Sequence, residues 1–77
     1  METVLLGRIT LNPNVGHGKP TVRNTRYLVE GLLEYLAAGD SIDEVLEAFP
    51  DLEQEDLLAC IQYALATLKV KSANLAA

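Results

Sequence analysis

Five side chains in the first third of this sequence are suited to binding a charged partner: Arg8, His17, Lys19, Arg23 and Arg26. Arginine and lysine can contact the phosphates of a nucleic acid, and each such contact adds to the salt dependence of binding. The same side chains can instead pair with the carboxylates of a protein. These residues are therefore the predicted site for binding a protein partner or DNA.

The distribution of charge leaves several partners open. Residues 1–29 carry four cations and one carboxylate, a net charge of +3, whereas residues 30–77 carry two lysines and ten carboxylates, a net charge of −8. A basic arm on an acidic body can meet an anionic partner, its own body or a second copy of the chain. Composition does not choose among these three.

Catalysis would need a reactive group that a second side chain orients or activates. His17 is the only histidine, and Cys60, the only cysteine, fits a buried position on a helix. Gly18 and Lys19 lack the spacing of a phosphate-binding loop, and Pro20 stands where that loop has serine or threonine. One strong ligand does not make a metal site. The sequence therefore predicts a binding protein, not an enzyme, without metal or other cofactor.

The overall composition predicts one small cytoplasmic domain. The 77 residues are 49% apolar, which suits a folded chain but leaves a thin margin of stability that a homodimer would widen. The single cysteine excludes an internal disulfide. No signal-peptide pattern opens the sequence, and its apolar stretches are interrupted well short of a membrane span.

Two short β-prone segments must position the cations of the arm. Val4 to Leu11 fits a strand that ends at the turn-forming residues Asn12 to Asn14, and Thr21 to Arg23 fits a second strand. The expected product is a hairpin with a long loop. Such a hairpin is not stable alone, so it must pack on the helices or pair with another chain.

Three helices are expected after the arm. Apolar residues from Val29 to Ala37 recur with helical spacing, and Gly39 suits the end of that helix. Ser41 and Glu44 have the spacing of a capping box for a second helix that closes at Pro50. A third helix is expected from about Gln54 to Lys69, with Glu53 as its cap and a wide apolar face: Leu57, Leu58, Ile61, Ala64, Leu65 and Leu68.

These elements predict a mainly α fold, a homeodomain-like three-helix core with a short N-terminal β-hairpin arm. The second and third helices have the lengths and tight connection of a helix-turn-helix. The expected division of the single domain, residues 1–77, is a basic β-containing arm over residues 1–26, a trihelical core over residues 27–70 and a frayed tail over residues 71–77.

The sequence resembles the domain-of-unknown-function 433 family over about residues 8 to 68. The motifs that carry this resemblance are Arg8-Ile9-Thr10-Leu11-Asn12-Pro13-Asn14-Val15, His17-Gly18-Lys19-Pro20-Thr21-Val22-Arg23, Thr25-Arg26, Ala38-Gly39, Ser41-Ile42, Phe49-Pro50-Asp51-Leu52, Glu55-Asp56 and Ala64. The resemblance implies a helix-turn-helix-class fold. It also implies the antitoxin half of a type II toxin–antitoxin pair, whose partner is a PIN-like nuclease toxin.

Three positions depart from the family pattern. Asn24 replaces a usual Gly, although Asn tolerates positive φ well. Leu28 replaces a common Pro, which would allow the first helix to begin earlier and Arg26 to pair with Glu30 along it. Gly16 stands where Cys or Ser is frequent, which puts in doubt any role for a side chain before His17.

The expected recognition helix is poorly suited to DNA. Its first turn carries Glu53, Glu55 and Asp56, which phosphates would repel, so any DNA contact is expected from the basic arm. For Lys19 and Arg23, a phosphate contact and an internal ion pair are equally open. The acidic faces suit the basic groove of a partner, or they are simply solvated surfaces.

Three hypotheses follow. The first is an antitoxin-like protein that binds a nuclease-type toxin and regulates its own operon. The second is a stand-alone homodimeric DNA-binding regulator. The third is a structural homo-oligomer in which the β arm pairs with a second chain.

Overall fold

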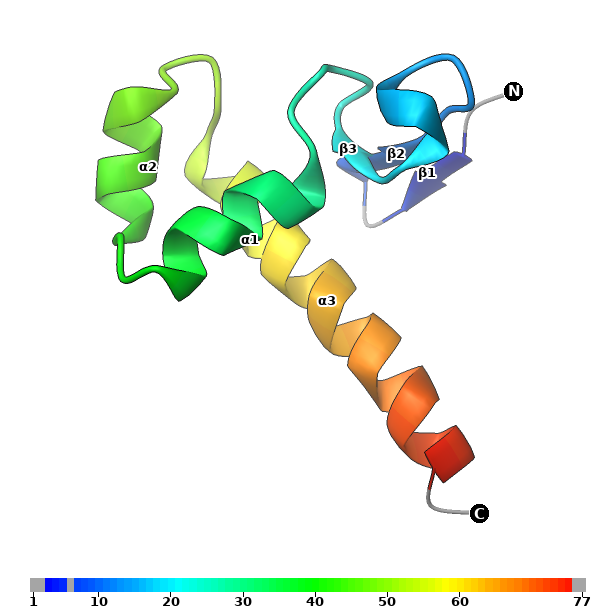
Figure 1. Cartoon of the computed structure of the whole chain (residues 1–77). Coiled ribbons are helices and arrows are strands. Elements are labelled where there is room, and N and C mark those ends of the chain that lie inside the picture. Colours follow the sequence, from blue (N-terminus) through cyan, green and yellow to red (C-terminus); the bar gives the residue numbers. More distant parts are fainter. Residues whose placement is uncertain (1–2, 6, 76–77) are drawn as a thin grey trace.

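The computed structural model describes residues 3–5 and 7–75 of the chain, and side chains from residue 7 to residue 70. The elements are β1 (Thr3–Leu5), β2 (Ile9–Leu11), the 3-10 turn η1 (Gly16–Gly18), β3 (Thr21–Val22), α1 (Val29–Ala37), α2 (Ile42–Ala48) and α3 (Gln54–Leu75). Figure 1 shows the small sheet on one side of the upper part of α3, α2 on the other side, and α1 crossing the start of α3. The predicted mainly α fold with a β arm is confirmed.

The arm is a three-stranded antiparallel sheet in the order β1-β2-β3. The predicted hairpin corresponds to β2 and β3, with Ile9 opposite Val22. The sequence pattern predicted one strand from Val4 to Leu11, whereas the structure has two strands in this segment. Gly7 has a φ of 72°, and β1 pairs back on β2 with Leu5 opposite Ile9. A glycine inside an apolar run supplies this reversal because it adopts positive φ without steric cost.

The first helix does not begin early. Leu28 is extended and forms a β-bridge with Thr21, and the Val29 amide donates to the Pro20 carbonyl over 3.0 Å. These contacts extend the sheet pairing up to the start of α1. Arg26 therefore lies in the loop before the helix, and the predicted helical pair with Glu30 is wrong.

The capping box of α2 is confirmed. The Ser41 hydroxyl accepts a hydrogen bond from the Glu44 amide over 3.1 Å, and the Glu44 carboxylate accepts one from the Ser41 amide over 2.8 Å. The helix ends at Ala48, before Phe49 and Pro50, as the proline predicts.

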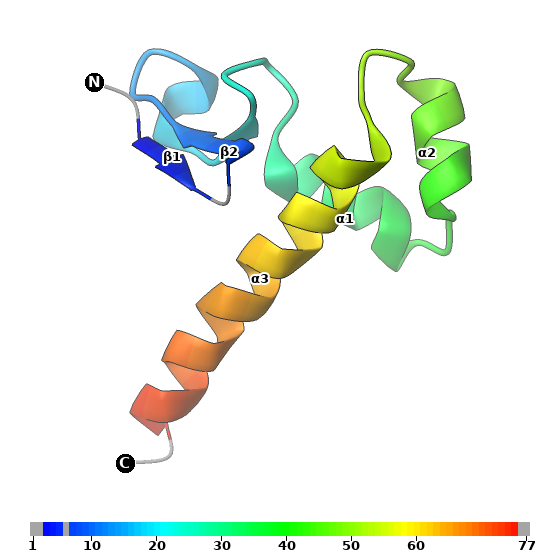
Figure 2. The same cartoon turned by 180° about the vertical axis from the view of Figure 1, so that it is seen from behind.

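The third helix is longer than predicted, because it continues to Leu75. Most of the tail that was expected to fray is therefore helical, and no Gly or Pro after Gln54 interrupts it. In both Figure 1 and Figure 2 the C-terminal half of α3 extends beyond the other elements. The radius of gyration is 13.0 Å, above the value of about 11.5 Å for a compact domain of this length.

The core lies where the sheet, α1, α2 and the first turns of α3 meet. Cys60 is fully buried there, as predicted. The buried apolar residues are Ile9, Val22, Val29, Leu32, Val45, Leu52, Leu57, Ala59 and Cys60. Of the expected apolar face of α3, only Leu57 belongs to this core, and Leu58, Ile61, Leu65 and Leu68 are exposed.

Candidate functional site

The arm contacts the start of α3 through one buried carboxylate, that of Asp56. The side chain of Asp56 is fully buried and accepts hydrogen bonds from Arg8 Nη1 over 2.8 Å, Arg23 Nε over 3.1 Å and Arg23 Nη2 over 2.9 Å. Its second oxygen also accepts from the Glu53 amide over 2.8 Å. Arg8 Nη1 lies 2.7 Å from Glu53 Oε1 as well. Two guanidinium groups thus face two carboxylates in what we call the arm–helix cluster: Arg8, Arg23, Glu53 and Asp56.

Asp56 stays ionised at neutral pH despite its burial. Burial pushes the pKa of Asp56 upward, but the hydrogen bond from the Glu53 amide and those from Arg8 and Arg23 outweigh it and hold the pKa below its ordinary value. The pKa of Arg8 is raised by its hydrogen bonds to Glu53 and then to Asp56. Charge-assisted hydrogen bonds of this kind fix the orientation of the arm on the core.

The backbone of the arm delivers both arginines to the same place. The Arg23 amide donates to the Arg8 carbonyl over 2.7 Å, so the two residues are neighbours at the end of the β2–β3 pairing. Arg23 and Asn24 both have positive φ, of 47° and 60°. The φ of Asn24 is one that asparagine tolerates well, and the Asn24 side chain accepts a hydrogen bond from Asn12 over 3.0 Å.

The other predicted binding residues lie elsewhere. Lys19 pairs with Glu30 of α1 over 2.7 Å, and that hydrogen bond raises the pKa of Lys19. Arg26 is exposed and makes no salt bridge with a carboxylate in the described part of the chain. His17 is exposed at the tip of η1 with a φ of 56°. The five predicted residues thus do not converge on a single site.

The glycine before His17 has a packing reason. Gly16 has a φ of 61°, and a Cβ placed on it would lie 2.9 Å from methyl carbons of both Leu28 and Thr21. The side chain of Leu28, which is larger than the proline common at this position in the family, occupies the space that a side chain at position 16 would need.

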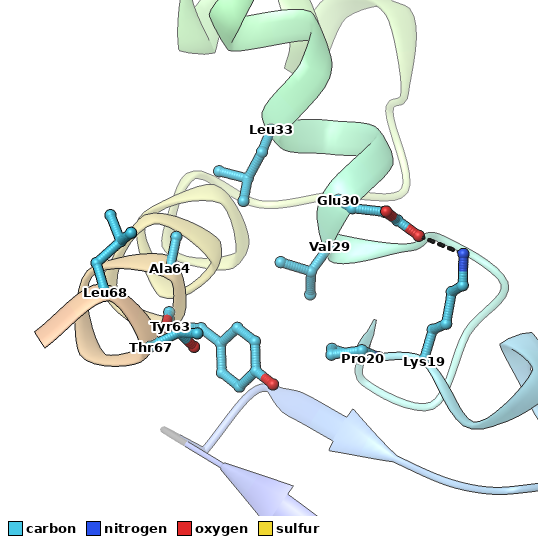
Figure 3. Close-up of a pocket in the computed structure, with 9 residues that line it drawn as sticks. All are labelled: Lys19, Pro20, Val29, Glu30, Leu33, Tyr63, Ala64, Thr67 and Leu68. Carbon is cyan, nitrogen blue, oxygen red and sulfur yellow. Dashed lines mark hydrogen bonds and ion pairs between the residues drawn. The ribbon is translucent and has the colours of Figure 1, made fainter. Parts of the chain in front are cut away.

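A groove that the sequence did not predict lies between α1 and the middle of α3. It has a volume of about 520 Å³ and a mainly apolar lining: Lys19, Pro20, Val29, Glu30, Leu33, Tyr63, Ala64, Thr67 and Leu68. Figure 3 shows the Lys19–Glu30 ion pair at one rim, with Pro20 and Val29 facing Tyr63 and with Ala64 and Leu68 along the opposite wall. The sequence feature that could have indicated this groove is the row of apolar residues on α3, which continues along the helix beyond the residues that are buried in the core.

The described residues contain neither a candidate metal site nor a helix that could span a membrane. Among residues 3–5 and 7–75, no three histidine, cysteine, aspartate or glutamate side chains gather where they could hold a metal ion. No helix in the same part of the chain is long and apolar enough to cross a membrane.

Comparison with known proteins places the chain in a family. Residues 9–64 match the family model described as protein of unknown function (DUF433). An uncharacterized protein of Sinorhizobium fredii (strain NBRC 101917 / NGR234), y4eO, is 38% identical over 58 residues, which are 75% of this chain and 26% of that protein. The chain thus spans about a quarter of this relative, and no solved structure matches. Since the family model covers most of the chain, this protein belongs to the DUF433 family.

Proposed function

We propose that this protein is an antitoxin-like binding protein of a type II toxin–antitoxin pair, which docks a nuclease-type protein partner in the cytoplasm. The observation that carries the proposal is the open apolar groove between α1 and α3. Apolar grooves on proteins bind the apolar face of a partner's helix, and the Lys19–Glu30 pair at the rim adds charged groups beside the apolar lining.

The arm–helix cluster favours a protein partner over DNA. Arg8 and Arg23 are already paired with carboxylates of the body, so a phosphate would have to compete with Glu53 and Asp56 for them. Arg8 and Arg23 also lie on the first turn of α3 at Glu53 and Asp56, in the part of a recognition helix that would meet the bases. The remaining surface of α2 carries exposed Asp43, Glu44 and Glu47, which suit a basic partner.

The test is co-expression with the product of the adjacent gene, followed by affinity capture and an RNase assay. A bulky side chain in the groove, Thr67→Trp, is expected to weaken capture and restore RNase activity. Ala66→Trp is the matched control, because Ala66 is also exposed on α3 but does not line the groove. Capture that both variants retain equally would contradict docking in the groove. A neighbouring gene without a small nuclease-like product would remove the toxin from the proposal.

DNA binding by a homodimer, including regulation of its own operon, is the second candidate. It is favoured by the exposure of His17, Lys19 and Arg26 on the arm side of the molecule. It predicts a mobility shift of the protein's own promoter at low salt that weakens steeply as the salt concentration rises. A folded dimer that gives no shift at about 50 mM salt, where phosphate contacts are strong, would exclude it.

A further inference from the structure

Four exposed apolar side chains form a single row along α3, which we call the α3 stripe: Leu58, Ile61, Leu65 and Leu68. Their exposed fractions are 41%, 40%, 50% and 60%. Their spacing of three, four and three residues is that of the core positions of a coiled-coil heptad. The sheet, α1 and α2 pack against other sides of the helix, where Asp56, Leu57 and Cys60 are buried. The stripe is thus a helix-packing surface that the chain itself leaves uncovered.

We propose that the α3 stripe is covered by the same stripe of a second copy, with the two α3 helices antiparallel. Leu68 also lines the groove proposed for the toxin, whereas Leu58, Ile61 and Leu65 do not, so the two sites adjoin at Leu68. The spacing of the stripe residues is symmetric about position 63. A two-fold axis there sets Leu58 against Leu68 of the second copy and Ile61 against its Leu65. This self-complementarity is what a two-fold symmetric interface requires.

The charges beside the stripe select the antiparallel orientation. Glu55 and Lys69 are two heptads apart, so they lie in the same row along one edge of the stripe, separated by about 21 Å of helix. The antiparallel arrangement brings Glu55 of each copy near Lys69 of the other. A parallel arrangement would instead align the two acidic first turns, which contain Glu53 and Glu55, and would align the helix dipoles unfavourably. Exposed pairs of this kind decide orientation more than affinity.

The accessible surface of the chain is larger than that of a compact monomer. The accessible surface is 5262 Å², compared with about 4,600 Å² for a folded monomer of this mass. The excess agrees with the projection of α3 beyond the other elements in Figures 1 and 2. Because most helical stability in proteins comes from packing of an apolar face, a projecting helix with an exposed apolar row is stabilised when a second helix covers that row.

Sedimentation equilibrium of the full chain tests the proposal. The wild type is expected to be a dimer at micromolar concentrations, and Leu65→Glu is expected to raise the dimer Kd at least about 30-fold. Ala66→Glu places the same charge next to Leu65 but outside the stripe and is expected to remain dimeric. Circular dichroism confirms that each variant is folded. A wild-type monomer at high micromolar concentration, or a dimer that Leu65→Glu leaves intact, would overturn the proposal.

Orientation is tested by charge reversal. Glu55→Lys and Lys69→Glu are each expected to raise the dimer Kd several-fold, and the double variant to return it towards the wild-type value. In a parallel dimer these two positions are far apart, so the effects of the two changes would simply add. Additive effects would therefore overturn the antiparallel arrangement.

Discussion

Arg23 donates hydrogen bonds to the carboxylate of Asp56 from two of its nitrogens, over 3.1 and 2.9 Å, although the residues are 33 positions apart in the sequence. Arg8 binds the same carboxylate from the neighbouring segment of the arm. The arm is therefore part of the folded body, and its charge is balanced by the acidic start of α3.

Loss of the Asp56 charge is expected to destabilise the fold. Asp56→Asn leaves Arg8 and Arg23 facing a neutral group, and we expect the free energy of unfolding to fall by about 3 kcal/mol, the lower end for breaking a buried ion pair. Both arginines keep partial access to water, which limits the loss. Urea unfolding measures the change. Glu47→Gln on the exposed face of α2 should change the free energy by less than about 0.5 kcal/mol; equal effects of the two variants would contradict a structural role for the cluster.

Stability should fall in acid because of the same carboxylate. The pKa of Asp56 is below its ordinary value of 3.8 in the folded chain. Its contribution to stability is therefore complete above about pH 5, where the unfolded group is also almost fully ionised, and is lost as the pH falls through the lower folded pKa. Unfolding measured from pH 7 to pH 2 should show the difference between wild type and Asp56→Asn narrowing below about pH 5. A difference that stays constant over this range would contradict the assignment.

The cap of α2 makes a separate contribution. Ser41→Ala removes the acceptor for the Glu44 amide, and we expect a loss of about 1 kcal/mol in the free energy of unfolding. Ser41→Asp keeps an acceptor at the same position and should retain most of the stability. Thermal unfolding of the two variants distinguishes a loss of the cap from a general effect of substitution at Ser41, which would lower both melting temperatures alike.

Local features of the fold were predictable from the sequence, and its long-range contacts were not. The cap at Ser41 and the end of α2 at Pro50 depend on residues within a few positions of each other. Asp56, in contrast, is one of several acids in the first turn of a helix, and only the packed structure shows that it is buried beneath the arm. The spacing of α3 predicted an apolar face, but not that the core would cover only part of it. That depends on how far α1 and the sheet reach along the helix.

Cys60 should be unreactive in the folded chain. Its burial, followed by the nearby Asp56 carboxylate, raises the pKa of the Cys60 thiol to about 11. At pH 8 only about one thiol in a thousand is then ionised, and thiolate is the nucleophile. We expect iodoacetamide to modify native Cys60 at the rate of transient unfolding and to modify the chain rapidly in urea, as mass spectrometry would show. Because Asp56→Asn populates the unfolded state more, it should speed the reaction, whereas Glu47→Gln should not. Rapid labelling of the native wild type would contradict the burial of Cys60 in the core.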